Sequence, residues 1–231
     1  MQDPTKWGWR SMSETHIVLL LLLACSILLM QKATAADPDP LVDFPPNAST
    51  PVFRDIFSLG VVGKGSGGVK AGLNVTIFPG LKSQGITVIQ FRMLPCGENL
   101  PHTHPRATEL LSMISGGPLQ AGFVDTKGVS KIYIVYPGDL IIFPRGLLHF
   151  ELNVGNETAF FLSSFNSENP GIQDSAGGLL QLPERAAAIA LNQDLETIRS
   201  LKSQRKYNDP STLVAAKNGV CIPGQFIDTD I

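Results

Sequence analysis

The chain has 231 residues, of which 43% are hydrophobic and 16% are charged, and its formal net charge is −2. A chain this close to neutrality, without a cluster of basic residues, is not expected to bind nucleic acid. The length is sufficient for one well-packed domain or two small ones.

The first 35 residues have the layout of a secretory signal peptide. Lys6 and Arg10 precede an apolar run from Ile17 to Met30, and Ala33-Thr34-Ala35 supplies a small-residue cleavage site. The alternative is a membrane anchor, but the run is shorter than the roughly 20 residues that span a bilayer. We expect residues 1–35 to be removed, with Met12 as an alternative start, and the mature protein to be secreted without a membrane span.

Residues 36–72 are predicted to form an N-terminal arm followed by a glycine-rich loop. The stretch from Asp37 to Pro51 is rich in Pro and Asp, which indicates an extended arm. Four glycines then surround Lys64, but a phosphate-binding loop would require a strand before them, a helix after them and a terminal Lys-Ser/Thr pair. We therefore expect the segment from Gly60 to Gly72 to be a flexible loop.

Residues 73–180 are predicted to form an all-β domain. Short runs rich in β-branched and aromatic residues alternate with Gly and Pro turns, a pattern typical of a sandwich or barrel. The expected strands are Leu73–Ile77, Ile86–Leu94, Glu109–Ser115, Leu119–Val124, Lys131–Val135, Leu140–Phe143, His149–Val154 and Thr158–Ser164.

Residues 181–231 are predicted to form two C-terminal helices and a tail. Pro183–Leu191 and Asp194–Ser203 are rich in good helix formers, and Pro183 suits the start of a helix. Three apolar residues recur on one face of the second helix, so this face must pack on the barrel or on a neighbouring subunit. Asn208–Ile231 is expected to be an irregular tail.

Two cysteines, Cys96 and Cys221, remain after the leader is removed. In an oxidising compartment they either form one disulfide or remain as two separate thiols, because the sequence does not give their separation. Three sequons, at Asn47, Asn74 and Asn156, permit N-glycosylation of a secreted chain.

The three histidines that follow the leader lie in two short motifs. One motif contains His102, His104 and Glu109, and the other contains His149. His102 and His104 are two residues apart, so on an extended segment both side chains point to the same side. Pro105 introduces a bend that resets the register, which allows Glu109 to face the same interior. His149 is expected to complete the set from a distant strand.

Three imidazoles and one carboxylate are a complete set of protein ligands for a divalent metal. The mixture of nitrogen donors with a hard oxygen donor suits Mn(II) or Fe(II), while Zn, Ni, Co and Cu remain open. On the predicted strand of His149, Glu151 and Asn153 share its face, so this face is expected to line a polar cavity.

The two motifs closely resemble those of the germin-like proteins, plant members of the cupin superfamily. The family's first motif combines glycine, His-x-His, glutamate and a later glycine, and its second reads G-x5-P-x-G-x2-H-x3-N. The matching residues are Gly97, His102, His104, Glu109 and Gly116 in the first motif, and Gly138, Pro144, Gly146, His149 and Asn153 in the second.

This resemblance implies a double-sheet cupin jelly-roll β-barrel with C-terminal helices and Mn(II) bound by His102, His104, Glu109 and His149. It also implies a homo-hexamer, arranged as a trimer of dimers that the C-terminal helices join, in the plant apoplast. Typical germins pair two cysteines near the mature N-terminus, but 41–55 contains none here. The chain therefore looks like a divergent member of the family.

Three functions follow from the resemblance and the ligand set. The preferred one is dismutation of superoxide, a small anion that a net positive first shell would attract. The second is oxalate oxidase: Asn99 matches one of two substrate-orienting asparagines, unless it is only a turn residue, but Ile89 falls near the place of the other. The third is a non-catalytic wall glycoprotein, in which the metal stabilises the fold.

Overall fold

The computed structural model describes residues 42–204, 213–217 and 219–225. The predicted signal peptide and part of the predicted arm lie outside these residues. Within them, no helix is long and apolar enough to span a membrane. The elements are α2 (Ile56–Leu59), β1 (Val61–Gly65), β2 (Gly68–Gly72), η1 (Pro79–Leu81), β3 (Thr87–Met93), β4 (Gly97–Thr103), β5 (Glu109–Val124), β6 (Ser130–Val135), β7 (Leu140–Phe143), β8 (Leu148–Phe165), β9 (Gln173–Asp174), α3 (Ser175–Gln181), α4 (Glu184–Leu191), α5 (Leu195–Gln204) and β10 (Val214–Ala215).

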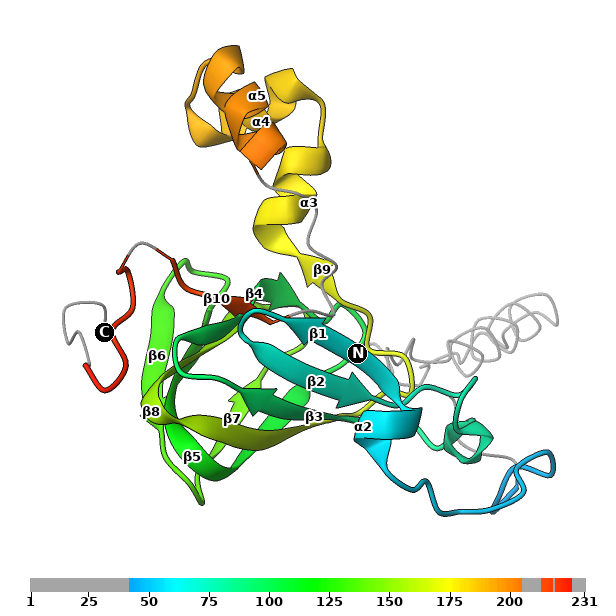
Figure 1. The fold of residues 1–231 in the computed structure, drawn as a ribbon. Helices are drawn as coiled ribbons and strands as arrows, with labels where there is room; N and C mark the ends of the chain where they lie inside the picture. Colours follow the sequence, from blue (N-terminus) through cyan, green and yellow to red (C-terminus); the bar gives the residue numbers. More distant parts are fainter. Residues whose placement is uncertain (1–41, 205–212, 218, 226–231) are drawn as a thin grey trace, which may run out of the picture. The chain divides into compact units, whose positions relative to one another are not determined.

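Two long antiparallel strands, β5 and β8, form the centre of the barrel (Figure 1). The first part of β5 pairs with the last part of β8, and this pair is flanked by β7 on one side and by β3, β2 and β1 on the other. The second part of β5 pairs with the first part of β8, flanked by β6 and by β4. The all-β fold predicted from the sequence is confirmed, since β5 and β8 run through one antiparallel sheet that includes the ten strands of the described residues.

Bends within β5 and β8 explain why the sequence predicts four strands where the structure has two. Gly116 and Gly117 have positive φ and precede Pro118, and the β5–β8 register shifts there. On β8, a Cβ at Gly155 would lie 1.6 Å from the carbonyl oxygen of Gly117, so only glycine permits this close approach. The predicted turns are therefore irregularities inside continuous strands.

The barrel core is formed mainly by buried side chains of the strands. Alternate residues of β5 and β8 are buried, as expected for strands with one apolar face. Phe91 and Phe161 stack at the centre with ring centroids 4.4 Å apart. The remaining buried members of the cluster are Met93, Leu111, Met113, Leu119, Ala121, Val135, Phe143, Ala159 and Leu213.

The predictions for residues 60–77 are wrong. The glycine-rich segment expected to be a loop forms the β1–β2 hairpin, which pairs with β3. The strand predicted at Leu73–Ile77 is a turn, because the side-chain oxygen of Asn74 accepts hydrogen bonds from the backbone N–H groups of Thr76 and Ile77. Asparagine favours such turns over strands.

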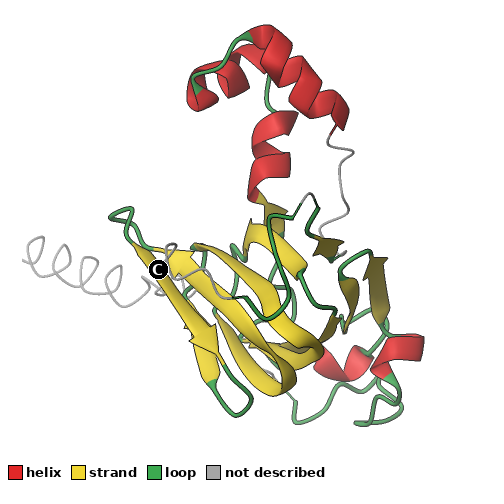
Figure 2. Ribbon diagram, turned by 60° about the vertical axis from the view of Figure 1, so that its left-hand side comes forward, coloured by secondary structure: helices red, strands yellow, loops and turns green. Residues whose placement is uncertain are grey.

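The C-terminal helices form a group of their own beyond β9 (Figure 2). The two predicted helices are present as α4 and α5, and Ile198 packs on Ala187 and Ala188 between them. The sequence did not predict α3, which Asp174 begins by accepting a hydrogen bond from the N–H of Gly177. Part of the predicted tail is also ordered on the barrel, since β10 pairs with β4.

Candidate metal centre

Four buried side chains from separate parts of the chain converge on one another. His102 lies on β4, His104 follows that strand, Glu109 begins β5 and His149 is the second residue of β8. The β4–β8 register places His102 directly opposite His149, and the turn at Pro105-Arg106 separates His104 from β5. One donor atom from each residue lies within 4.8 Å of the other three, and all four residues are buried.

Backbone carbonyls fix the orientation of all three imidazoles. The Nδ1 atoms of His102 and His149 lie 2.7 Å from the carbonyl oxygens of Leu100 and Leu147, and Nδ1 of His104 contacts the carbonyl oxygen of Gly171. A carbonyl only accepts hydrogen bonds, so each Nδ1 must carry the proton. In the neutral rings Nε2 is then left as a free electron-pair donor, the form that a metal ligand requires.

The donor atoms face one another, and a cation between them would bind them all. Nε2 of His102 lies 3.2 Å from Nε2 of His104, and Oε2 of Glu109 lies 3.2 Å from Nε2 of His104 and 3.3 Å from Nε2 of His149. Oε2 of Glu109 and Nε2 of His149 are nevertheless buried without a well-directed hydrogen bond among the described residues. Electron-pair donors that face one another at these distances fit a divalent metal.

Burial and mutual charge shift the pKa values of this cluster. Burial, followed by the charges of His149 and His104, lowers the pKa of His102 well below 6.5. Burial alone would raise the pKa of Glu109, but its contacts with His104 and His149 lower it. Burial alone would lower the pKa of His149, but the contact with Glu109 raises it. Glu109 is therefore an anion, as a metal ligand should be.

A second buried polar group lies behind the ligands. The Asn99 side chain, 4% exposed, donates through Nδ2 to Oε2 of Glu151 at 2.8 Å and accepts at Oδ1 from Nζ of Lys70, also at 2.8 Å. Glu151 is fully buried; burial and the charge of Glu109 raise its pKa to about 8. Asn99 therefore lies within β4 rather than in a turn, and its amide bridges a cation and a carboxyl group.

Sequence reasoning placed Glu151 on the ligand face without a role and missed Lys70. The reason is that Lys70 belongs to the segment interpreted as a loop. In a strand, successive side chains point to opposite faces. If Gly68–Gly72 had been interpreted as a strand, Lys70 would therefore have been a candidate for the face that points into the barrel. Ile89 lies nearby on β3 and contributes no polar atom to the cavity beside His104.

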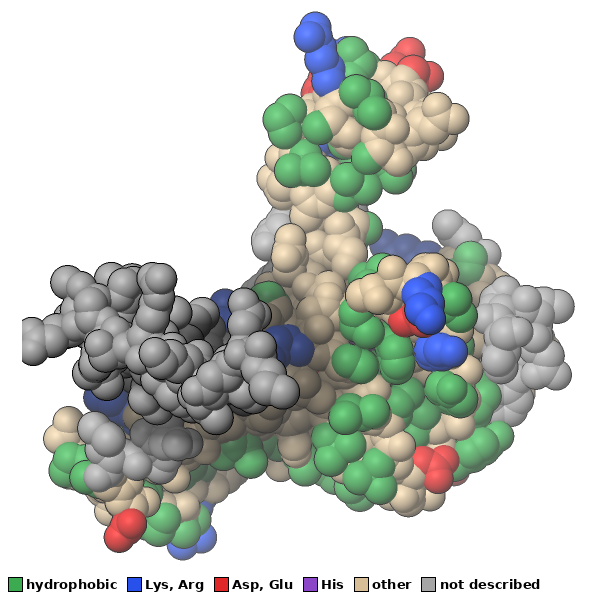
Figure 3. Space-filling view, turned by 180° about the vertical axis from the view of Figure 1, so that it is seen from behind, with side chains coloured by type: hydrophobic (Ala, Val, Ile, Leu, Met, Phe, Trp, Pro, Cys, Tyr) green, Lys and Arg blue, Asp and Glu red, His purple; other side chains and the backbone are tan. Residues whose placement is uncertain are grey.

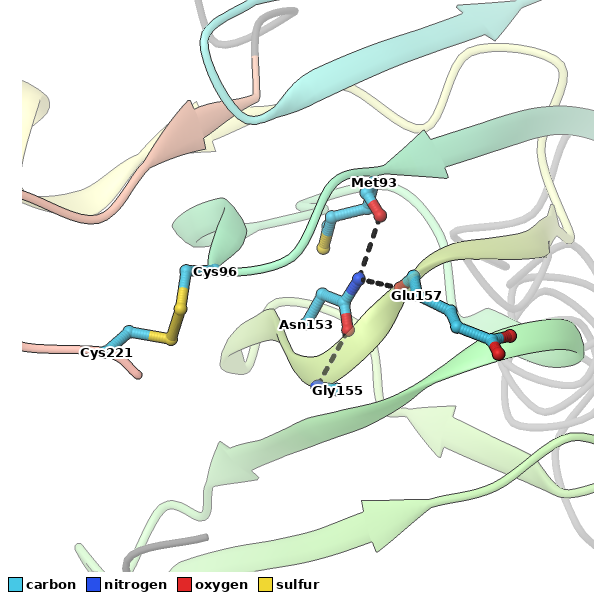
Figure 4. The surroundings of a disulfide bond; sticks show 6 residues. All are labelled: Met93, Cys96, Asn153, Gly155, Glu157 and Cys221. Atoms are coloured by element: carbon cyan, nitrogen blue, oxygen red, sulfur yellow. Dashed lines mark hydrogen bonds between the residues drawn. A yellow bond between two sulfur atoms is a disulfide. The ribbon is translucent and has the colours of Figure 1, made fainter. Parts of the chain in front are cut away.

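The two cysteines and the three sequons are not part of the ligand set. Cys96 and Cys221 form a disulfide, with Cα atoms 5.7 Å apart, that fixes the C-terminal tail to the β3–β4 connection (Figure 4). Asn47 and Asn156 are exposed, whereas Asn74 is partly buried and its side-chain oxygen is used in the turn described above.

Comparisons with known proteins agree with this geometry. Residues 58–199 match the Cupin family model. The chain is 32% identical over 225 residues to germin-like protein 3-8 of Oryza sativa subsp. japonica, which covers 84% of this chain and all of the relative. It is 33% identical over 216 residues to germin-like protein subfamily 2 member 1 of Arabidopsis thaliana, covering 83% and 97%. A solved structure of recombinant oxalate oxidase in complex with glycolate is similar with a TM-score of 0.65 and 29% identity, covering 73% of this chain and 98% of that one.

Proposed function

Since the chain belongs to the germin-like proteins of the cupin family, we propose that it is a secreted, manganese-dependent oxidoreductase that dismutates superoxide. The observation that carries this proposal is the convergence of three Nε2 atoms and one carboxylate oxygen within 4.8 Å in a buried site. The Nδ1 atom of each of these three histidines is hydrogen-bonded to a backbone carbonyl.

Manganese, when bound, supplies the one-electron oxidation and reduction by which two superoxide ions and two protons become dioxygen and hydrogen peroxide. The hard carboxylate among the nitrogen donors supports Mn(II), and the same set accommodates Fe(II). His102, His104, Glu109 and His149 would hold the ion. These residues are buried, and one carboxylate would not neutralise a divalent charge, so the loaded site would attract a small anion.

The test is superoxide dismutation by the secreted protein with its metal content measured. We expect activity in proportion to bound Mn, and we expect His149→Ala to lose both metal and activity. Glu157→Gln changes an exposed residue of the same strand and serves as the matched control, which should retain both. A fully Mn-loaded wild type without dismutation would overturn the proposal in favour of a wall glycoprotein whose metal stabilises the fold.

Oxalate oxidation is the second candidate, and the similarity to solved oxalate oxidase structures favours it. Two features of the cavity oppose it: Ile89 offers no amide, and the Asn99 amide is already hydrogen-bonded at both ends, to Lys70 and Glu151. Oxalate consumption by the Mn-loaded protein, measured beside dismutation, separates the two candidates. Consumption of oxalate without dismutation would select the second.

We also propose that the mature protein is a glycosylated homo-oligomer of the plant apoplast, assembled as a hexamer from three dimers. The relatives from rice and Arabidopsis support the plant setting. Exposure of Asn47 and Asn156 supports glycosylation at these sequons more than at the partly buried Asn74. Support for the oligomer comes from apolar side chains that α4 and α5 leave exposed.

A further inference from the structure

One ligand of the metal centre is oriented from a distant part of the chain. Nδ1 of His104 donates to the carbonyl oxygen of Gly171. The carbonyls that orient His102 and His149 lie only two residues earlier in the chain. Gly171 lies between β8 and β9, in a segment (166–172) without helix or strand. The orientation of His104 therefore depends on the contacts that hold this irregular segment in place.

The two ends of the segment are held by β4 and by the turn that follows it. At its start, the side-chain oxygen of Asn166 accepts from the backbone N–H of Thr108 at 2.8 Å. Directly after its end, β9 pairs with β4, with Gln173 opposite Thr103. Residues 167–172 lie between these attachments and outside the strand pairing. The direction of the carbonyl in this stretch must therefore be set by contacts other than a strand ladder.

Arg106 supplies three hydrogen bonds to the middle of the segment. Its backbone N–H donates to the carbonyl oxygen of Pro170 at 3.1 Å. Its Nε and Nη2 atoms donate to the carbonyl oxygen and to Oδ1 of Asn169, each at 2.7 Å. A guanidinium is planar and carries its donors in a fixed fork, so two such bonds to one residue determine the orientation of that residue as well as its position. Arg106 therefore joins the β4–β5 turn to the two residues that precede Gly171.

The guanidinium of Arg106 also lies directly against Gly171. Gly171 has a φ of +68°, and a Cβ on it would lie 2.8 Å from Nη2 and 3.0 Å from Cζ of Arg106. Glycine is therefore required both by the backbone conformation and by the approach of the arginine. The same short segment is thus held twice from one turn, by the imidazole of His104 and by the side chain two residues later.

The charge of Arg106 does not by itself favour a metal. A cation near a divalent ion repels it, so a neutral side chain here would favour metal binding on electrostatic grounds alone, weakly because Arg106 is exposed and screened. The hydrogen bonds to 169–171 act in the opposite direction, because they keep the acceptor of the His104 proton in place. Loss of such an outer partner typically weakens metal binding about 10- to 100-fold. The two effects differ in sign, so an experiment can separate them.

We propose that Arg106 is a positioning residue of the metal centre. It holds 169–171 so that the carbonyl of Gly171 keeps the proton of His104 on Nδ1 and leaves Nε2 free to bind the ion. The proposal rests on the proposed function only in that His104 is a metal ligand. It deepens that function, because it assigns to a residue outside the four ligands the task of keeping one of them in its binding form.

The first test observes the imidazole protons of the metal-free mature protein by NMR, after isotopic labelling of the histidine side chains. In wild type we expect all three Nδ1–H protons to exchange slowly with water, because each is hydrogen-bonded in a buried residue. In Arg106→Gln the Nδ1–H of His104 should exchange about 10-fold faster. The Nδ1–H protons of His102 and His149 should be unchanged, since their carbonyls belong to their own motifs.

The second test measures the dissociation constant of Mn(II) for each variant. Arg106→Gln should bind Mn(II) about 10-fold more weakly than wild type, although it removes a positive charge. Asn169→Ala keeps the arginine but removes one acceptor, so it should weaken binding in the same direction and by less. Arg185→Gln removes the same charge from an exposed position of α4 and is the matched control, which should bind Mn(II) as wild type does.

Two results overturn the proposal. One is unchanged exchange at His104 in Arg106→Gln, or Mn(II) binding equal to or tighter than that of wild type. The other is faster exchange at all three histidines together with a lower melting temperature, because that pattern means that Arg106 supports the fold in general. If Arg106→Gln does not fold, Asn169→Ala takes its place in both measurements and the same outcomes decide.

Failure of this proposal is distinguishable from failure of the proposed function, because neither measurement uses turnover. Mn-loaded wild type without dismutation refutes the superoxide activity, and a selective effect of Arg106→Gln on His104 then still stands. Dismutation by wild type, together with an Arg106→Gln variant in which His104 exchange and Mn(II) affinity are unchanged, refutes the positioning role alone.

Discussion

Each imidazole of the metal centre is oriented by a backbone carbonyl at Nδ1. For His102 and His149 the carbonyl lies two residues earlier in the chain, at Leu100 and Leu147, so each short motif carries its own support. His104 instead depends on Gly171, 67 residues away. The ring of His104 also contacts Phe165 edge-on, with centroids 4.7 Å apart. Orientation is thus set before a metal arrives.

The raised pKa of Glu151 predicts how the metal-free protein responds to pH. A carboxyl group whose pKa is about 8 in the folded state and 4.5 ordinarily holds a proton that the unfolded chain has lost. Its contribution to stability is therefore complete below about pH 4.5 and is lost as the pH rises through about 8. Glu151→Gln cannot ionise and should escape this loss.

Thermal unfolding of the metal-free protein checks this expectation. The melting temperature of Glu151→Gln should exceed that of wild type by several degrees near pH 8, and by much less near pH 5. The same difference at both pH values would contradict the assignment of the raised pKa to Glu151.

Asn153 is a second buried polar residue with a clear energetic role. Its Nδ2 donates to the carbonyl oxygens of Met93 and Glu157, and its Oδ1 accepts from the N–H of Gly155 (Figure 4). Asn153→Ala leaves these backbone groups without partners and should cost about 3 kcal/mol of the free energy of unfolding. Urea unfolding measures this change in the free energy of unfolding, with Glu157→Gln as the control. A decrease below about 1 kcal/mol for Asn153→Ala would refute the assigned role.

At the scale of elements, periodicity predicted most of the barrel strands and both C-terminal helices α4 and α5. It failed where glycine dominates the local composition. The β1–β2 hairpin is stabilised by pairing with β3, and α3 contains Gly177 and Gly178, which disfavour a helix until Asp174 caps it. Pairing with a distant strand decided the hairpin, whereas the local signal for α3, the Asp174 cap, was obscured by the two glycines that follow it.

The same limit applies to the candidate site. The four residues of the metal centre were predicted as a group, because their spacing and chemistry are local features of two motifs. Lys70 was missed, because its place depends on a hairpin that only strand pairing defines. Site residues that belong to a short motif could be predicted from the sequence. A site residue whose position depends on pairing between distant strands could not.

The Cys96–Cys221 disulfide is expected to contribute substantially to stability. It closes a segment with a sequence separation of 125, and restricting so long a loop in the unfolded chain is worth about 2–4 kcal/mol. The Cys96→Ser/Cys221→Ser double variant should therefore unfold at a lower temperature than oxidised wild type. Reduced wild type is the control and should unfold with the double variant; no difference among the three would show that the disulfide does not stabilise the fold.

At the scale of the whole molecule, apolar side chains remain on the surface of the described residues. Figure 3 shows hydrophobic side chains over both the helices and the barrel face seen in that view. Ile189 on α4 is 83% exposed, and Leu182, Leu191 and Leu201 are also exposed on or beside these helices. Exposed apolar groups clustered in this way are typical of surfaces that another protein covers.

If the proposed oligomer uses these helices, one charge at Ile189 should weaken it. Ile189→Glu places a carboxylate among apolar groups that would be buried on assembly, which is unfavourable. Light scattering coupled to size exclusion should show a smaller mass than for wild type. Gln193→Glu adds the same charge at an exposed polar position nearby and should keep the wild-type mass; an unchanged mass for Ile189→Glu would exclude this residue from the interface.

The covalent link between Cys96 and Cys221 turns most of the molecule into a closed ring. All four residues of the metal centre, together with α3, α4 and α5, lie within that ring. One proteolytic cut between these elements opens the ring without releasing a fragment, so a nicked chain would still run as one band until a reductant is added. Where extracellular proteases are abundant, the residues of the metal site would therefore stay covalently connected after one cleavage. The same cleavage would separate a chain without the disulfide into two fragments.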